Sequence, residues 1–225
     1  QVTDIIHKKG GKVILVSNPI SFGILESPGV LGVDVSVGEA QPLGIPMSYG
    51  GETLGYFCAK KEYMRKIPGR VVGLTEDIKG RRGFVLTLQT REQHIRRERA
   101  TSNICSNQSL NALRATCYLA GVGKEGFILI SERNTKNALM LNNKLKEIGI
   151  EMLFPEQPFF NEFCFNVGDV DNFFDFCKNN GIIPGVKLKN FFPEYKSSIL
   201  TCVTETKTED DIERFAETVS RYLNE

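Results

Sequence analysis

Residues 89–108 read QTREQHIRRERATSNICSNQ and concentrate positive charge in a chain that is otherwise balanced. The whole chain carries 28 Lys and Arg residues against 27 Asp and Glu residues, a formal net charge of +1. A local surplus of arginine in such a chain indicates an anionic ligand or the acidic surface of a partner. The arginines are Arg91, Arg96, Arg97 and Arg99, and His94 lies among them.

Hydroxyl and amide side chains follow these arginines directly. Thr101, Ser102 and Asn103 all have N-cap chemistry, and apolar residues recur at helical spacing after them. We therefore predict a helix over residues 103–121, whose first backbone amides form an anion site. The plainer interpretation is that the arginines are solvated on one face and that one of the three residues simply caps the helix.

Composition excludes several classes of protein. A net charge near zero argues against a general nucleic-acid binder, and residues 89–108 contain no aromatic side chain on which a base would stack. The six cysteines lie at least a dozen residues apart and only two histidines are present, so we predict no metal site. Scattered cysteines favour a reducing cytoplasmic location, and no apolar run approaches the length of a membrane span.

The first half of the chain has the order of an α/β protein. Residues 2–9 read as the end of a helix, and residues 13–16 read as a strand buried on both faces. A short helix, SFGILES, and a strand at residues 33–37 complete one β-α-β step. Residues 38–55 hold five glycines and two prolines, which predicts a long, shaped loop of the kind that forms binding sites. Further strands are predicted at residues 56–59 and 84–88.

The second half changes character after a pair of helices, predicted at residues 103–121 and 124–148 and separated by Gly121 and Gly123. A strand, a helix, a strand and a final helix follow. Thr208, with Asp211 three residues on, has the spacing of a capping box at the start of that last helix. We expect residues 1–120 to be the C-terminal part of a large α/β domain, with residues 89–108 as its interface segment. Residues 121–225 are expected to form a bridging helix and a small C-terminal α+β domain.

Three stretches together resemble the glycine cleavage system P-protein. They are GVDVSVGEAQPLGIPMSYGGETLGYF from residue 32, MRKIPGRVVGLTEDIKGRRGFVLTLQ from residue 64 and QTREQHIRRERATSNICSNQSLNALRA from residue 89. Within this family the chain is most similar to the C-terminal half of the first, or alpha, subunit of the two-subunit bacterial form. We therefore expect the sequence to be a fragment or a processed chain.

The resemblance implies a fold and a reaction. The fold is that of fold-type I pyridoxal phosphate (PLP)-dependent transferases, similar to aspartate aminotransferase. The reaction is the decarboxylation of glycine with transfer of an aminomethyl group to the lipoyl H-protein. The implied partners are the beta subunit and the H-protein, with glycine as substrate and no nucleic acid or membrane.

The resemblance also implies that this chain lacks its own covalently bound cofactor. In the fold, the cofactor lysine lies in a His-Lys pair shortly beyond a Gly-x-Asp strand start, and the start at residues 32–34 places Gln41 and Pro42 at that pair. Asn18 likewise stands where an Asp normally lies beneath the pyridine nitrogen, and a neutral amide does not hold the pyridinium proton as a carboxylate does. The chain would then complete the active site of the beta subunit, which carries the PLP.

The same resemblance gives roles to the opening segment. Thr101, Ser102 and Asn103 match the place where a hydroxyl reaches the phosphate of the neighbour's cofactor. The basic residues there, Arg91, His94, Arg96, Arg97 and Arg99, are expected to contact the partner or the substrate, and no catalytic residue or metal ligand is expected on this chain. Two alternatives stay open: a self-sufficient PLP enzyme whose lysine lies elsewhere, Lys12 and Lys60 being the nearest, or a module that binds a nucleic acid or a partner through the arginine run.

Overall fold

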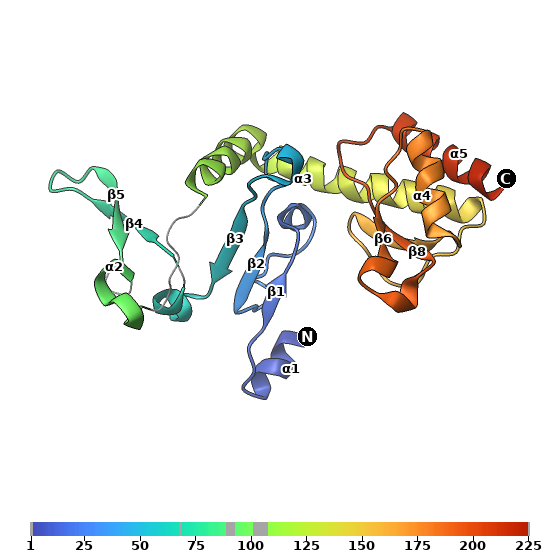
Figure 1. The fold of residues 1–225 in the computed structure, drawn as a ribbon. Coiled ribbons are helices and arrows are strands. Elements are labelled where there is room, and N and C mark those ends of the chain that lie inside the picture. The colour runs from blue at the N-terminus through green and yellow to red at the C-terminus, as the bar shows by residue number, and fades with distance from the viewer. Residues whose placement is uncertain (1, 68, 89–92, 101–107, 225) are drawn as a thin grey trace. The chain divides into compact units, whose positions relative to one another are not determined.

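The computed structural model describes residues 2–67, 69–88, 93–100 and 108–224 (Figure 1). The chain divides into two compact units, Gln1–Val122 and Gly123–Glu225. The helices are α1 (Val2–Lys8), α2 (Gln93–Arg96), α3 (Ser109–Glu147), α4 (Val170–Asn179) and α5 (Glu209–Leu223). The strands are β1 (Ile14–Val16), β2 (Val35–Glu39), β3 (Gly55–Ala59), β4 (Val71–Glu76), β5 (Arg82–Thr87), β6 (Glu162–Asn166), β7 (Val186–Lys187) and β8 (Ser198–Cys202).

The first unit is built on a three-stranded sheet of order β1-β2-β3 (Figure 1). β1 runs parallel to β2, and β3 runs antiparallel to β2. The predicted parallel step is therefore confirmed, but the predicted SFGILES helix inside it is wrong. A 3₁₀ helix, Pro19–Gly23, forms instead, because Asn18 caps it through Ile20 N at 3.0 Å, and Gly23 and Pro28 leave too few residues for a stable α-helix.

Strand β1 differs from its prediction in burial. Ile14 and Val16 are 64% and 75% exposed, so burial on both faces is wrong for the chain as the structure describes it. The apolar run identified the strand correctly, but it carries no information on which segment covers each face. In the described residues this face of the sheet stays open.

Strands β4 and β5 form a separate antiparallel hairpin. Asp77 closes its turn by accepting hydrogen bonds from Lys79 N at 2.8 Å and Arg81 N at 3.0 Å. The strand predicted at residues 84–88 corresponds to most of β5. Strand β4 was not predicted, since Gly73 interrupts its apolar run and weakens the strand signal.

Helix α3 is broken at Gly123, where φ is 65° and ψ is −178°, as the pair of predicted helices requires. Its start differs from the prediction: the helix begins at Ser109, and the Gln108 carbonyl accepts the first helical hydrogen bond, from Ala112 N at 2.8 Å. The run of residues 101–109 offers several polar residues able to cap a helix, and spacing alone does not choose among them.

The second unit packs the C-terminal part of α3 with α4 and α5 against an antiparallel sheet of order β6-β8-β7. Its core is fully buried, with Leu145, Phe165, Phe173, Ile199 and Val219 all at 0% exposure. The predicted capping box of α5 is confirmed. Thr208 Oγ1 accepts from Asp211 N at 3.1 Å, and the Asp211 carboxylate accepts from Thr208 N at 2.9 Å.

Candidate functional site at the carboxyl edge of the parallel strands

The parallel pair β1 and β2 brings two chain segments to one edge of the first sheet. Ser17 and Asn18 follow β1, and Glu39, which ends β2, is followed by Ala40 and Gln41. Ser17 N donates to Val37 O at 3.1 Å, which extends the pairing to the end of both strands. Ligands of open α/β sheets bind outside the carboxyl ends of their strands. This carboxyl edge is therefore the candidate site.

Three hydroxyl groups meet at the carboxyl edge. The Tyr56 hydroxyl lies 2.8 Å from Ser17 Oγ and 3.3 Å from Ser36 Oγ, and it donates to the Ser17 carbonyl at 3.1 Å. Gly38 makes this approach possible, because a Cβ there would lie 2.1 Å from Ser17 O and 2.6 Å from the Tyr56 ring. Tyr56 therefore joins the ends of β1 and β2.

The loop between β2 and β3, residues 40–54, is fastened at its base. The Glu39 carboxylate accepts hydrogen bonds from Gln41 N at 2.8 Å and from Leu54 N at 3.0 Å. Ala40 N donates to Leu54 O at 2.5 Å, and the Gln41 side chain donates to Ile45 O, also at 2.5 Å. The segment forms no strand or α-helix, as predicted for the glycine-rich stretch, and its ends are nevertheless fixed.

Helix α3 supports the far end of this loop. The buried Asn111 donates from Nδ2 to the carbonyls of Glu52 and Thr53, each at 3.3 Å. Gly44 lies against Tyr118, where a Cβ would meet the ring at 2.8 Å, and its φ of 80° also favours glycine. Both contacts position the loop relative to the first unit's own helix.

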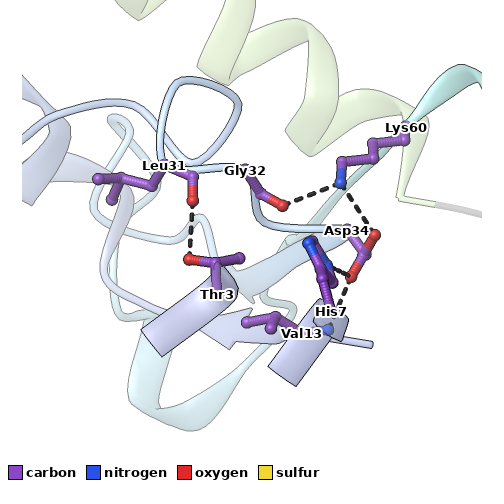
Figure 2. A network of polar contacts seen from close by, with 7 residues as sticks. All are labelled: Thr3, His7, Val13, Leu31, Gly32, Asp34 and Lys60. Atoms are coloured by element: carbon purple, nitrogen blue, oxygen red, sulfur yellow. Dashed lines mark hydrogen bonds and ion pairs between the residues drawn. The ribbon is translucent and has the colours of Figure 1, made fainter. Parts of the chain in front are cut away.

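A buried carboxylate marks the opposite, amino edge of the sheet (Figure 2). Asp34, 2% exposed, accepts a hydrogen bond from Val13 N at 2.8 Å and lies 2.7 Å from His7 Nε2. Lys60 donates from Nζ to Asp34 Oδ1 at 3.0 Å and to the Gly32 carbonyl at 2.9 Å. The Val13 amide, His7 and Lys60 together hold the pKa of Asp34 well below its usual range.

The two lysines nearest in sequence to the segments of the candidate site, Lys12 and Lys60, lie at this amino edge. Lys60 N pairs with Asp34 O at 3.0 Å, and the Lys12 ammonium stands 5.4 Å from the centroid of the Tyr63 ring. Gln41 lies seven residues beyond Asp34, on the order of 20 Å along an extended strand. Residues 17–18 and 36–56, which build the carboxyl edge, contain no lysine.

A covalently bound PLP does not fit the described carboxyl edge. It has no amine for the imine bond, and the Asn18 side chain, at the expected place beneath the pyridine nitrogen, accepts instead from its own chain at Ile20 N.

The predicted basic residues are only partly described. His94 and Arg96 belong to α2, and Arg97 and Arg99 to the 3₁₀ helix that follows; all four side chains are exposed. Arg99 Nε lies 3.9 Å from Glu98 Oε1. Four further predicted residues lie outside the described residues, namely Arg91, Thr101, Ser102 and Asn103.

Sequence reasoning missed the residues that organise the two edges. Tyr56 and Glu39 belong to no recognisable sequence motif. The position of Tyr56 directly after the glycine-rich loop is the one local signal that could have indicated it. Asp34 lies in a Gly-x-Asp strand start, and its partners His7 and Lys60 lie 27 and 26 residues away in the sequence, so no local motif reports the cluster.

No helix in the described residues is long and apolar enough to cross a membrane. No group of three or more His, Cys, Asp or Glu side chains within the described ranges is placed to hold a metal ion.

The chain has the fold of the fold-type I PLP-dependent transferases. A NifS-like protein from Rickettsia africae superposes with a TM-score of 0.68 at 16% identity. The superposition covers all of this chain and 57% of the NifS-like chain. The cysteine desulfurase CsdA from Escherichia coli gives a TM-score of 0.67 at 13% identity, covering 98% of this chain and 54% of its own. At these identities the likeness shows the fold alone.

The family follows from closer matches. The family model described as glycine cleavage system P-protein matches residues 1–219, and the chain belongs to this family. The resemblance found in the sequence is thereby confirmed. A crystal structure of an inhibitor-bound glycine decarboxylase (P-protein) superposes with a TM-score of 0.89 at 36% identity, over 98% of this chain and 50% of that one.

Curated relatives agree with this assignment. The probable glycine dehydrogenase (decarboxylating) subunit 1 of Shouchella clausii is 45% identical over 217 residues, which are 96% of this chain and 48% of the relative. The protein of the same name from Exiguobacterium sibiricum is 46% identical over 215 residues, which are 95% of this chain and 48% of the relative. The chain thus spans about half the length of the curated relatives that it matches.

Proposed function

We propose that this chain acts as part of subunit 1 of a two-subunit glycine decarboxylase, which decarboxylates glycine and passes an aminomethyl group to a lipoyl H-protein. The observation that carries the proposal is the superposition on glycine decarboxylase with a TM-score of 0.89 and 36% identity. The curated relatives named subunit 1 support a partner subunit. The unpaired described cysteines support our further proposal of a cytoplasmic location.

We propose that the partner subunit carries the cofactor. PLP supplies an electron sink for decarboxylation when it is bound. The carboxyl edge of this chain has no lysine, and both Lys12 and Lys60 lie at the amino edge. These placements also count against the alternative of a self-sufficient enzyme that uses either lysine. This subunit would then complete the partner's site.

The segment of residues 89–108 supplies the contacts in this proposal. Thr101, Ser102 and Asn103 are proposed to donate to the phosphate of the partner's cofactor. Helix α3 begins only at Ser109, so this role rests on their hydroxyl and amide groups and on the family resemblance.

The basic residues of the segment are proposed to meet the partner or the substrate carboxylate. Guanidinium groups bind carboxylates in a two-pronged fashion, which suits either role. The exposure of the four described side chains supports the proposal. The residues concerned are Arg91, His94, Arg96, Arg97 and Arg99.

The first test uses the full-length subunit alone and then with subunit 2. PLP is added, the absorbance band of a lysine imine is recorded, and borohydride reduction is followed by peptide mapping. We expect no stoichiometric labelled lysine on subunit 1 and a labelled lysine on subunit 2 in the complex. A saturable lysine adduct on subunit 1 would show that this chain binds the cofactor itself.

The second test concerns the proposed phosphate contacts. Thr101→Ala combined with Ser102→Ala should weaken PLP binding by the assembled complex about tenfold, the effect of losing one good hydrogen bond to a charged group. Thr116→Ala is the matched control, because its exposed hydroxyl donates only within α3, to Ala112 O at 2.8 Å. Equal PLP affinity in both variants would remove the phosphate role while leaving the subunit assignment intact.

A further inference from the structure

The loop that leaves the carboxyl edge presents two large side chains to solvent at its tip, residues 46–51. Met47 is 81% exposed, and Tyr49 is 110% exposed, which means that its side chain is entirely in solvent. No residue from Pro46 to Gly51 carries a charge. An uncharged tip with a thioether and a phenol suits an apolar protein surface, since a nucleic acid would require cations.

The backbone of the tip has an unusual conformation. Ser48 and Tyr49 both adopt left-handed φ values, 46° and 54°, which residues with a Cβ rarely do. Gly50 N donates to Met47 O and Gly51 N donates to Ser48 O, each at 3.0 Å, so the turn closes on itself. Strain of this kind persists only where the surroundings determine it, and it gathers at clamps and binding sites.

The tip is also held in place from its base. Glu39 fastens both ends of the loop, and Asn111 binds the carbonyls of Glu52 and Thr53. Tyr49 is therefore an aromatic side chain on a fixed support. Such a side chain loses little freedom on binding, and tyrosine is enriched among the residues that dominate interface energies.

We propose that Met47 and Tyr49 form an anchor that inserts into an apolar cleft of the partner subunit. The loop starts at the carboxyl edge, the edge where this fold binds its ligands, so the anchor fixes the two subunits close to the site that they share. The inference rests on the proposed function, because it takes the partner subunit as the occupant.

The test measures association of the full-length subunit 1 with subunit 2 by isothermal titration calorimetry. Tyr49→Ala should raise the Kd at least tenfold, as loss of an interface anchor does, and Tyr49→Phe should recover most of the affinity. Ile78→Ala is the matched control, since Ile78 is 102% exposed in the turn between β4 and β5. A photoreactive benzoylphenylalanine in place of Tyr49 should cross-link to subunit 2, and one in place of Ile78 should not.

Each contrary result has its own meaning. An unchanged Kd for Tyr49→Ala, or an equal loss for Tyr49→Ala and Ile78→Ala, overturns the anchor while wild-type association still supports the proposed function. A lower melting temperature of isolated subunit 1 on Tyr49→Ala overturns it too, because the side chain then packs within its own chain. If wild-type subunit 1 does not bind subunit 2, the proposed function is wrong, and the anchor proposal, which depends on it, is wrong as well.

Discussion

Lys60 donates a hydrogen bond to Asp34 Oδ1 at 3.0 Å, and this ion pair closes the sheet at the edge opposite the candidate site (Figure 2). Lys60 follows β3 and Asp34 precedes β2, so the pair fastens two neighbouring strands. His7 adds α1 to the same carboxylate. A buried acid with three partners makes the amino edge a fixed structural element of the first unit.

Replacing that acid should destabilise the first unit. Asp34→Asn keeps one acceptor but leaves the Lys60 ammonium without its counter-ion, and we expect the melting temperature to fall by roughly 5 °C or more at neutral pH. Asp175→Asn, an exposed acid of the second unit, is the control and should change little.

The pH dependence follows from the lowered pKa of Asp34. A carboxyl whose pKa is depressed in the folded state stabilises the protein above its unfolded pKa of about 4, and loses that effect as the pH falls toward the folded value. The difference between wild type and Asp34→Asn should therefore shrink below about pH 4. A difference that is constant with pH would contradict the ionic account.

Sequence reasoning succeeded where the signal is local. The capping box of Thr208 and Asp211 lies within one turn of α5, and Gly123 breaks a helix by its own backbone freedom. The order of β1 and β2 was also readable, since short apolar runs alternate with turn residues. These features depend on residues close together in the chain.

It failed where distant segments meet. The Tyr56 hydroxyl contacts Ser17, which lies 39 residues earlier in the chain, and Asp34 contacts His7 before it and Lys60 after it. Exposure of Val16 depends on whether another segment covers β1, which no pattern within β1 reports. The hydroxyl cluster of the candidate site therefore depends on contacts between residues far apart in the chain. The family resemblance indicated the chemistry of the site but not its geometry.

A surface cluster in the second unit should give a second acid-dependent effect. Asp171 accepts hydrogen bonds from Lys187, at 2.7 Å, and from Lys189, which together lower its pKa to about 2. The contribution to stability is present above the unfolded pKa of about 4 and is lost as the pH falls through about 2.

Urea unfolding of wild type and Asp171→Asn tests this cluster. Asp171 is 59% exposed, so the effect should be small and should decrease in high salt. We expect the two proteins to differ at neutral pH and to converge near pH 2. Convergence already at neutral pH in low salt would mean that the lysines do not bind this carboxylate in solution.

The described thiols should differ widely in reactivity. Burial raises the pKa of the Cys177 thiol to about 11, which lowers its thiolate fraction at neutral pH roughly a hundredfold below that of an ordinary cysteine. Cys58 and Cys117 are exposed. Timed alkylation with peptide mapping should label these two first and Cys177 only after unfolding. Early labelling of Cys177 would mean that the second unit opens readily.

The core of the second unit should be sensitive to a cavity. Phe173 is 0% exposed and packs edge-to-face on Tyr222, with ring centroids 5.0 Å apart. Phe173→Ala should lower the free energy of unfolding by about 3–5 kcal/mol. Phe191→Ala makes the same chemical change at a side chain that is 67% exposed, and it should cost about 1 kcal/mol or less. Similar losses in both variants would contradict this core.

Gly38 offers the most direct test that the carboxyl edge is the functional one. A Cβ at this position would lie 2.1 Å from the Ser17 carbonyl oxygen, a backbone atom that moves only if the ends of β1 and β2 separate. Gly38→Ala should therefore cost about 1–3 kcal/mol of stability and disturb the Tyr56 hydroxyl cluster.

Gly83→Ala provides the control, because Gly83 is also a strand glycine and a Cβ there meets nothing within 4 Å. Glycine decarboxylation by the assembled complex is then compared at a temperature where both variants stay folded. We expect at least a tenfold loss for Gly38→Ala and near wild-type activity for Gly83→Ala, since a misplacement of about 1 Å near a site costs on the order of a hundredfold. Full activity in a folded Gly38→Ala complex would mean that this edge only closes the sheet, and the partner's site would have to be completed by another surface of the chain.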